Sequence, residues 1–103
     1  METFYKPPFK KFVKKQARPL QLSIEDEIES IIENPAVGET KKGDLQGFQV
    51  HKFAYKKQQF LVAYRVFKSQ VLFYMVGPHE NFYRTLKNMW RKVISHDYGR
   101  KDL

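Results

Sequence analysis

The spacing of apolar residues changes along the chain. Between residues 7 and 33 apolar side chains recur every three or four positions, which is typical of amphipathic helices. Between residues 48 and 76 they alternate with polar ones or run together, which is typical of strands. A chain of 103 residues is long enough for one modest core and too short for two. The pattern therefore predicts a single domain, residues 1–103, of the α+β class.

Two helices are predicted near the N-terminus, after a short strand over Thr3–Lys6. The first opens at Pro7-Pro8, because proline suits the first helical turn, and it ends at Arg18-Pro19. The second begins near Ser23 and ends before Pro35. Phe9, Phe12, Val13 and Gln16 fall on one face of the first helix, and Ile24, Ile28, Ile31 and Ile32 recur at helical spacing in the second.

Three strands are predicted in the second half, after a loop over Val37–Gly47 that is rich in glycine and charge. They cover Phe48–Phe53, Gln59–Phe67 and Val71–Val76. The turns between them are too short for crossover connections, so the strands should form an antiparallel meander. A last helix over about His79–Ser95 completes the order β-α-α-β-β-β-α. The expected fold is a helical hairpin packed on a small, twisted, mainly antiparallel sheet.

The alternation within the middle strand predicts how the sheet is covered. Four bulky side chains of one parity are expected to face the helices: Phe60, Val62, Tyr64 and Val66. The residues of the other parity would face the open side of the sheet: Leu61, Ala63 and Arg65. All helices would then lie on one face. The core stripe expected of the last helix is Phe82, Leu86, Met89 and Val93. Trp90 is expected in the core rather than as a base-stacking platform.

The charge of the chain is large and unevenly distributed. Net charge is +8, from 19 basic and 11 acidic side chains. Five of the acidic ones lie between Glu25 and Glu33 in a segment without Lys or Arg, so the rest of the chain carries 19 basic and 6 acidic side chains. Such an excess of positive charge attracts phosphates irrespective of sequence. The pattern favours binding to nucleic acid or ribosomes; a soluble basic domain without such a partner is the alternative.

Several function classes lack their motifs here. There is no cysteine, hence no disulfide framework and no thiolate metal site. His51, His79 and His96 lack zinc-motif spacing, and there is no P-loop, G-x-S-x-G or dinucleotide fingerprint. We therefore expect no metal and no cofactor. The start, METFYKPPFKK, has no signal-peptide core, and no apolar run approaches the roughly 20 residues of a membrane span, so a cytoplasmic protein is expected.

One stretch combines titratable and aromatic residues where a strand gives way to a helix: YMVGPHENFYRTLK, Tyr74–Lys87. If Pro78 is the first helical residue, His79 lies in the first turn, where free backbone N–H groups attract anions. Tyr83, four residues on, would lie on the same side of the helix. Imidazole, phenol and backbone donors are groups that RNA cleavage by 2′-hydroxyl attack requires. The alternative is an ordinary surface histidine followed by a tyrosine packed on the sheet.

Other basic residues are open to two interpretations. Lys52, Lys56 and Lys57 either bind phosphate or are solvated hairpin lysines. Arg65 is the one charged residue inside an otherwise apolar strand, and a charge in that position needs a partner. A role is therefore expected for Arg65.

With these motifs in view, the sequence resembles the RelE/ParE superfamily of bacterial type II toxin–antitoxin toxins. The resemblance covers the element order of almost the whole chain and is strongest in NPAVGETKKGDLQGFQVHKF (Asn34–Phe53), LVAYRV (Leu61–Val66) and GPHENFYRTLK (Gly77–Lys87). It implies a single RelE-like toxin domain that cleaves mRNA in the ribosomal A site without a metal. It also implies inhibition of translation and neutralisation by a tightly bound, acidic, cognate antitoxin.

The resemblance also implies roles for individual residues. His79 matches the histidine of the YafQ-type toxins that donates or accepts a proton, and Tyr83 matches the aromatic residue that orients the substrate. His51 and Lys52 lie on the strand that supplies basic catalytic residues, and strict alternation lets only one of them face the cleft. The residues expected to hold rRNA or mRNA phosphates are Lys41, Lys42, Lys56, Lys57, Arg65 and Arg84.

Two positions depart from the family pattern. Leu61 stands where RelE-type toxins have an arginine, and the pair Pro78-His79 replaces an arginine near the last turn. These departures favour histidine-based cleavage. Two alternatives remain open. One is a ParE-like toxin that poisons DNA gyrase by protein contact, for which His79 would be dispensable. The other is an inactive relative that binds RNA or antitoxin without cutting.

Overall fold

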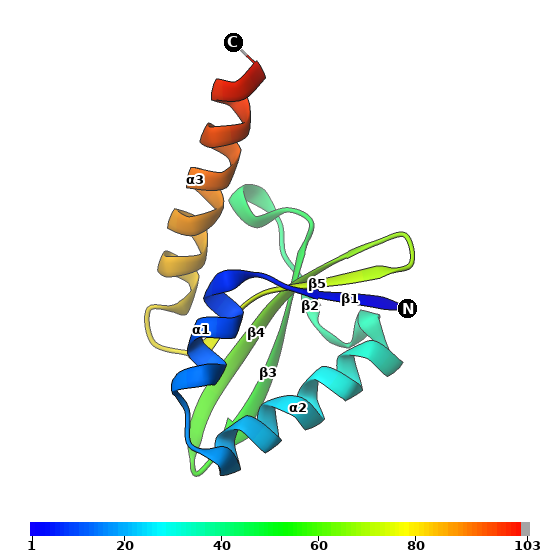
Figure 1. The fold of residues 1–103 in the computed structure, drawn as a ribbon, viewed down its shortest axis with the longest axis vertical. Coiled ribbons are helices and arrows are strands. Elements are labelled where there is room, and N and C mark those ends of the chain that lie inside the picture. The colour runs from blue at the N-terminus through cyan, green and yellow to red at the C-terminus, as the bar shows by residue number, and fades with distance from the viewer. Residues whose placement is uncertain (102–103) are drawn as a thin grey trace.

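The computed structural model describes the backbone of residues 1–101 and the side chains of residues 1–94. It contains three α-helices, two short 3-10 helices (η1 and η2) and a five-stranded sheet (Figure 1). In chain order the elements are β1 (Glu2–Tyr5), α1 (Pro7–Lys15), α2 (Arg18–Glu33), η1 (Pro35–Val37), β2 (Glu39–Thr40), η2 (Gly43–Leu45), β3 (Phe48–Tyr55), β4 (Gln58–Phe67), β5 (Gln70–Pro78) and α3 (Phe82–Lys101).

The sheet has the order β1-β5-β4-β3-β2. The predicted meander is confirmed, since β3, β4 and β5 pair antiparallel in sequence order. β1 joins the sheet as a parallel edge strand beside β5, and the two-residue β2 forms the opposite edge beside β3. β2 lies within the segment that the sequence predicts to be a loop. Together these pairings give the predicted α+β fold with a mainly antiparallel sheet.

Helices cover both faces of the sheet, so the prediction that they all lie on one face is wrong. α1 and α2 pack on one face, which we call the hairpin face, against residues such as Phe60, Val62 and Tyr64. α3 packs on the other, the α3 face, where Phe82 and Leu86 form a second core. Leu61 and Ala63, predicted to face an open side, are fully buried in that second core: their exposed fraction is 0%.

The first helix begins at Pro7 as predicted, whereas the starts of the other two helices are shifted. α2 begins at Arg18 rather than near Ser23, because Pro19 lies in its first turn, where its missing N–H costs no hydrogen bond. Pro78 belongs to β5 and α3 begins only at Phe82, so the prediction that Pro78 opens the helix is wrong. β1 pairs only with residues 70–73 of β5, so Pro78 removes no sheet hydrogen bond on that side.

The core stripe of α3 is shorter than predicted. Phe82 and Leu86 are buried, and Met89 and Trp90 are partly buried against the second core. Val93, however, is 39% exposed. Figure 1 shows that the C-terminal part of α3 extends beyond the sheet. No helix in the described part of the chain is long and apolar enough to span a bilayer.

Candidate catalytic cluster

The pairing of β3 with β4 determines which of His51 and Lys52 lies on which face. His51 is paired with Val62, which belongs to the hairpin-face core, and Lys52 with Leu61, which belongs to the α3-face core. Because neighbouring residues of a strand point to opposite faces, Lys52 lies on the α3 face and His51 on the hairpin face. The register thus shows which residue lies on which face, and the catalytic roles predicted for His51 and Lys52 remain predictions.

His51 has a partner on the hairpin face. Its Nε2 lies 2.7 Å from Oε1 of Glu27, a residue of α2. The two side chains are only 16% and 26% exposed. The pair connects α2 to the sheet, so the histidine inside the strand has a structural partner.

On the α3 face, Lys41 lies between a carboxylate and an aromatic ring. Its Nζ is 2.5 Å from Oε1 of Glu39 and 4.7 Å from the centre of the Tyr83 ring. The side chain of Lys41 is 20% exposed, whereas that of Glu39 is 66% exposed. β2 supplies Glu39, and the backbone N–H of Lys41 donates to the carbonyl of Phe48, which holds the segment against β3.

The charges of this pair reinforce one another. The hydrogen bond from Lys41, together with its charge, lowers the pKa of the Glu39 carboxyl, and the charge of Lys52 contributes a smaller lowering. The hydrogen bond to Glu39 raises the pKa of Lys41, and contact with Tyr83 raises it further. Near neutral pH the pair is therefore a carboxylate beside an ammonium group.

His79 lies in the turn between β5 and α3 rather than in the first turn of the helix. Its backbone N–H donates to the carbonyl of Gln59, and its own carbonyl accepts from Phe82. Asn81 takes a left-handed conformation, with φ +62°, to complete the turn. Even so, the imidazole meets the Tyr83 ring edge to face, with 6.5 Å between ring centres. The predicted pairing of His79 with Tyr83 is confirmed, although its predicted helical spacing is wrong.

These contacts form a row, Glu39–Lys41–Tyr83–His79, which we call the α3-face cluster. A carboxylate and an imidazole stand at its two ends, with an ammonium group and a phenol between them. Lys52 approaches Glu39 from β3. Glu39 is the member that reasoning from the sequence missed. Its spacing from Lys41 was the available signal, since residues two apart in extended chain point the same way.

Within the described side chains, no three His, Cys, Asp or Glu residues lie close enough to hold a metal ion. His51 and His79 lie on different faces of the sheet, and the side chain of His96 is outside the described residues.

Comparison with known proteins agrees with this fold. A family model described as "ParE-like toxin of type II bacterial toxin-antitoxin system" matches residues 4–87. The chain belongs to this family. A search of curated proteins found no match.

The fold of the toxin is also found in solved structures from E. coli. One is the intact RelBE toxin–antitoxin complex: a chain of it matches with 16% identity and a TM-score of 0.61, over 77% of this chain and 96% of that one. The isolated RelE toxin matches with 15% identity and a TM-score of 0.58, over 85% and 97%. At such low identity the likeness shows a common fold. The predicted superfamily of toxins is confirmed by the family model over residues 4–87.

Most of the other predicted basic residues lie exposed near the cluster in the chain. Lys42 directly follows Lys41, and Arg84 directly follows Tyr83. Lys56 and Lys57 form the β3–β4 turn with positive φ values of 48° and 65°. This turn lies at the His79 end of the sheet, because Gln59, just after it, accepts the His79 N–H. The proposed roles of these residues in phosphate binding remain predictions.

Arg65 lies apart from the cluster, at the far end of β4, opposite Phe48. Its guanidinium lies 5.0 Å from the ring centre of Phe48 and 4.8 Å from that of Trp90. It also donates to the carbonyl of Gln46. Trp90 packs as predicted, and the arginine has the partners that a charge in a strand requires. Its predicted contact with RNA remains a prediction.

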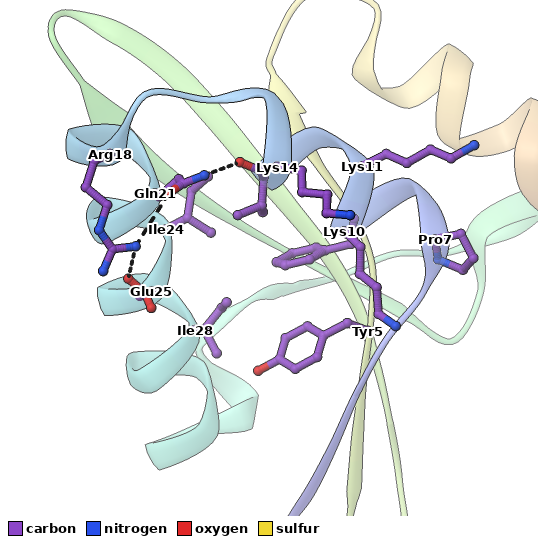
Figure 2. Close-up of a pocket in the computed structure, with 12 residues that line it drawn as sticks. Tyr5, Pro7, Lys10, Lys11, Lys14, Arg18, Gln21, Ile24, Glu25 and Ile28 are labelled. Atoms are coloured by element: carbon purple, nitrogen blue, oxygen red, sulfur yellow. Dashed lines mark hydrogen bonds and ion pairs between the residues drawn. The ribbon is translucent and has the colours of Figure 1, made fainter.

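The hairpin face carries a separate groove between α1, α2 and β1 (Figure 2). Its volume is about 610 Å³. Apolar side chains form its floor, and four cations stand at its rim, one of them, Arg18, 3.7 Å from Glu25. The floor consists of Tyr5, Phe9, Val13, Ile24 and Ile28, and the cations are Lys10, Lys11, Lys14 and Arg18.

Proposed function

We propose that the toxin is an endoribonuclease that cleaves mRNA on the ribosome and thereby inhibits translation. The observation that carries this proposal is the α3-face cluster. It places a proton acceptor, two cationic groups and a histidine around one exposed surface, which is what cleavage of RNA by its own 2′-hydroxyl requires. The family membership supports the toxin role.

In the proposed step, the 2′-hydroxyl attacks the adjacent phosphorus while the 5′ oxygen leaves from the opposite side. Glu39 accepts the proton of the 2′-hydroxyl as the O2′–P bond forms. His79 donates a proton to the 5′ oxygen as the P–O5′ bond breaks. The products are a 2′,3′-cyclic phosphate and a 5′-hydroxyl. Because attack and departure are in line, base and acid belong on opposite sides of the phosphate, as at the two ends of the row.

The remaining members of the cluster act on charge and orientation. Lys41 and Lys52 stabilise the extra negative charge on the phosphate in the transition state. The Tyr83 ring offers a surface on which a base can stack. Lys42, Lys56, Lys57 and Arg84 contact neighbouring phosphates of mRNA or rRNA, which position the substrate without reading its sequence. This work takes place in the cytoplasm, where ribosomes are.

The proposal is tested by inducing the toxin in cells and mapping mRNA ends. We expect new 5′ ends within translated messages for the wild type and their loss for His79→Ala. His51→Ala serves as the matched control, because that histidine faces α2, and it should retain cleavage per folded molecule. Growth arrest with intact mRNA would point to a gyrase poison instead. Normal growth after wild-type induction would point to an inactive relative.

We also propose that the hairpin-face groove binds the cognate antitoxin through an acidic amphipathic segment. The apolar floor suits the apolar side of such a segment, and the four rim cations suit carboxylates along its edges. Lys14→Glu should weaken antitoxin binding at least about 10-fold, because it places like charges together at the rim. Lys57→Glu, a matched charge reversal in the β3–β4 turn, should leave affinity within about 2-fold. Equal effects of the two would show that only net charge matters.

A further inference from the structure

The hydroxyl of Tyr64 makes two hydrogen bonds to a single turn of the chain. Tyr64 is fully buried in the hairpin-face core. Its Oη donates to the carbonyl of Pro35 at 2.7 Å and accepts the backbone N–H of Gly38 at 2.9 Å. Burial raises the pKa of this phenol, so it stays a donor at neutral pH. The hydroxyl thus fixes both ends of η1 to the sheet.

The turn fits closely on the phenol. A Cβ added at Gly38 would lie 2.5 Å from the Tyr64 hydroxyl oxygen. Only glycine allows the backbone to approach this near. The next residue is Glu39, the first of β2, and β2 pairs with β3 through only two residues. So short a strand has little pairing of its own to fix its position.

We infer that Tyr64 is a positioning residue of the α3-face cluster, holding the Pro35–Gly38 turn so that Glu39 pairs with Lys41 and Lys41 reaches the Tyr83 ring. It acts from the opposite face of the sheet and touches no substrate. Without the hydroxyl, the Pro35 carbonyl and the Gly38 N–H would lose their partner, and the turn would move to find others. The catalytic consequence rests on the function proposed above, whereas the placement of Lys41 does not.

The placement of Lys41 can be measured without any RNA. In the wild type, Glu39 and Tyr83 keep the Lys41 amine protonated, which slows its reaction with acetic anhydride because only the neutral amine reacts. In Tyr64→Phe we expect acetylation of Lys41, measured by mass spectrometry against Lys57 in the same molecules, to rise about 3-fold or more. Tyr55→Phe, a matched change in β3, should leave the ratio unchanged.

Gly38→Ala provides a second route to the same test if Tyr64→Phe does not fold. It keeps the hydroxyl but pushes the turn away from it, so Lys41 should again react faster. An unchanged Lys41 ratio in either folded variant would overturn the inference, even if the wild type cleaves mRNA normally.

Cleavage kinetics supply the functional half of the test. Tyr64→Phe should lower the cleavage rate by about 10-fold to 10²-fold, as expected for a small displacement of catalytic groups. Glu39→Gln should cost less in the Tyr64→Phe background than in the wild type, because both changes disturb the same pair. Additive losses would overturn the inference. Changed Lys41 reactivity in a toxin that cleaves no RNA would instead support the positioning role and refute the proposed nuclease.

Discussion

His51 and His79 share a side-chain chemistry and differ in their neighbours. His51 is held by Glu27 on the hairpin face, whereas His79 faces Tyr83 on the α3 face. Likewise Lys41 stands out among the lysines because Glu39 and Tyr83 surround it. A residue's partners, more than its type, therefore distinguish the residues of the α3-face cluster from those that stabilise the fold.

The Glu39–Lys41 pair predicts a specific dependence of stability on pH. The pKa of Glu39 is lowered from its usual 4.5, so the folded state favours the carboxylate. The contribution of the pair is present above pH 4.5 and is lost as pH falls below it. Wild type should be more stable than Glu39→Gln to urea at pH 7, and the difference should shrink progressively as pH falls below 4.5. Glu29→Gln is the control; a difference that persists at low pH would contradict the pairing.

At the scale of elements, the start of α3 determines where Tyr83 lies, and the second core fixes α3 on the sheet. The Arg65 guanidinium contributes by bridging β4, Trp90 of α3 and the loop carbonyl of Gln46. Gly47 lies directly against it: a Cβ there would be 2.6 Å from the guanidinium, and its φ is +94°. The loop after η2 is thus shaped around the arginine.

Two glycines, Gly43 at the start of η2 and Gly47 in the loop after it, provide a matched comparison. Gly43 also has a positive φ, +66°, but a Cβ there would meet nothing within 4 Å. Gly43→Ala should therefore cost about 1 kcal/mol, from backbone strain alone. Gly47→Ala should cost about 2 kcal/mol or more, since it also displaces Arg65. Urea denaturation measures both. This role of Arg65 would be contradicted if the two substitutions lowered the free energy of unfolding equally. It would also be contradicted if the difference between them stayed the same in an Arg65→Ala background.

The sequence predicted the elements better than their arrangement. Amphipathic spacing identified α1 and most of α2, and alternation identified the three central strands. The prediction that one face of the sheet is open was wrong because the residues of both parities in β4 are mostly apolar. In such a strand, alternation cannot show which face, if any, is exposed. Leu61 and Ala63 were in fact the sign of a second core.

The candidate site was predictable only in part, for a physical reason. The stretch from Gly77 to Lys87 pointed to His79 and Tyr83. The two rings do contact each other, although His79 lies in the turn before α3 and not in its first helical turn. Glu39 went unnoticed because β2 is two residues long and has no period to detect. Its position depends on Tyr64, 25 residues further along the chain, and no local pattern reports such a contact.

On the scale of the whole molecule, the two faces of the sheet carry different surfaces. The α3 face carries the proposed catalytic cluster, with the lysines of the β3–β4 turn nearby. The hairpin face carries the apolar groove with its rim of cations (Figure 2). This division allows the proposed antitoxin segment to bind without contacting the catalytic groups, and it makes the two proposals separately testable by mutation.

The central claim is that the α3-face cluster cleaves RNA, with Glu39 as base and His79 as acid. Single-turnover cleavage of mRNA on programmed ribosomes tests it most directly. His79→Ala and Glu39→Gln should each lower the rate by about 10²-fold or more, with Glu29→Gln as control. Rates near wild type in both variants would contradict the account.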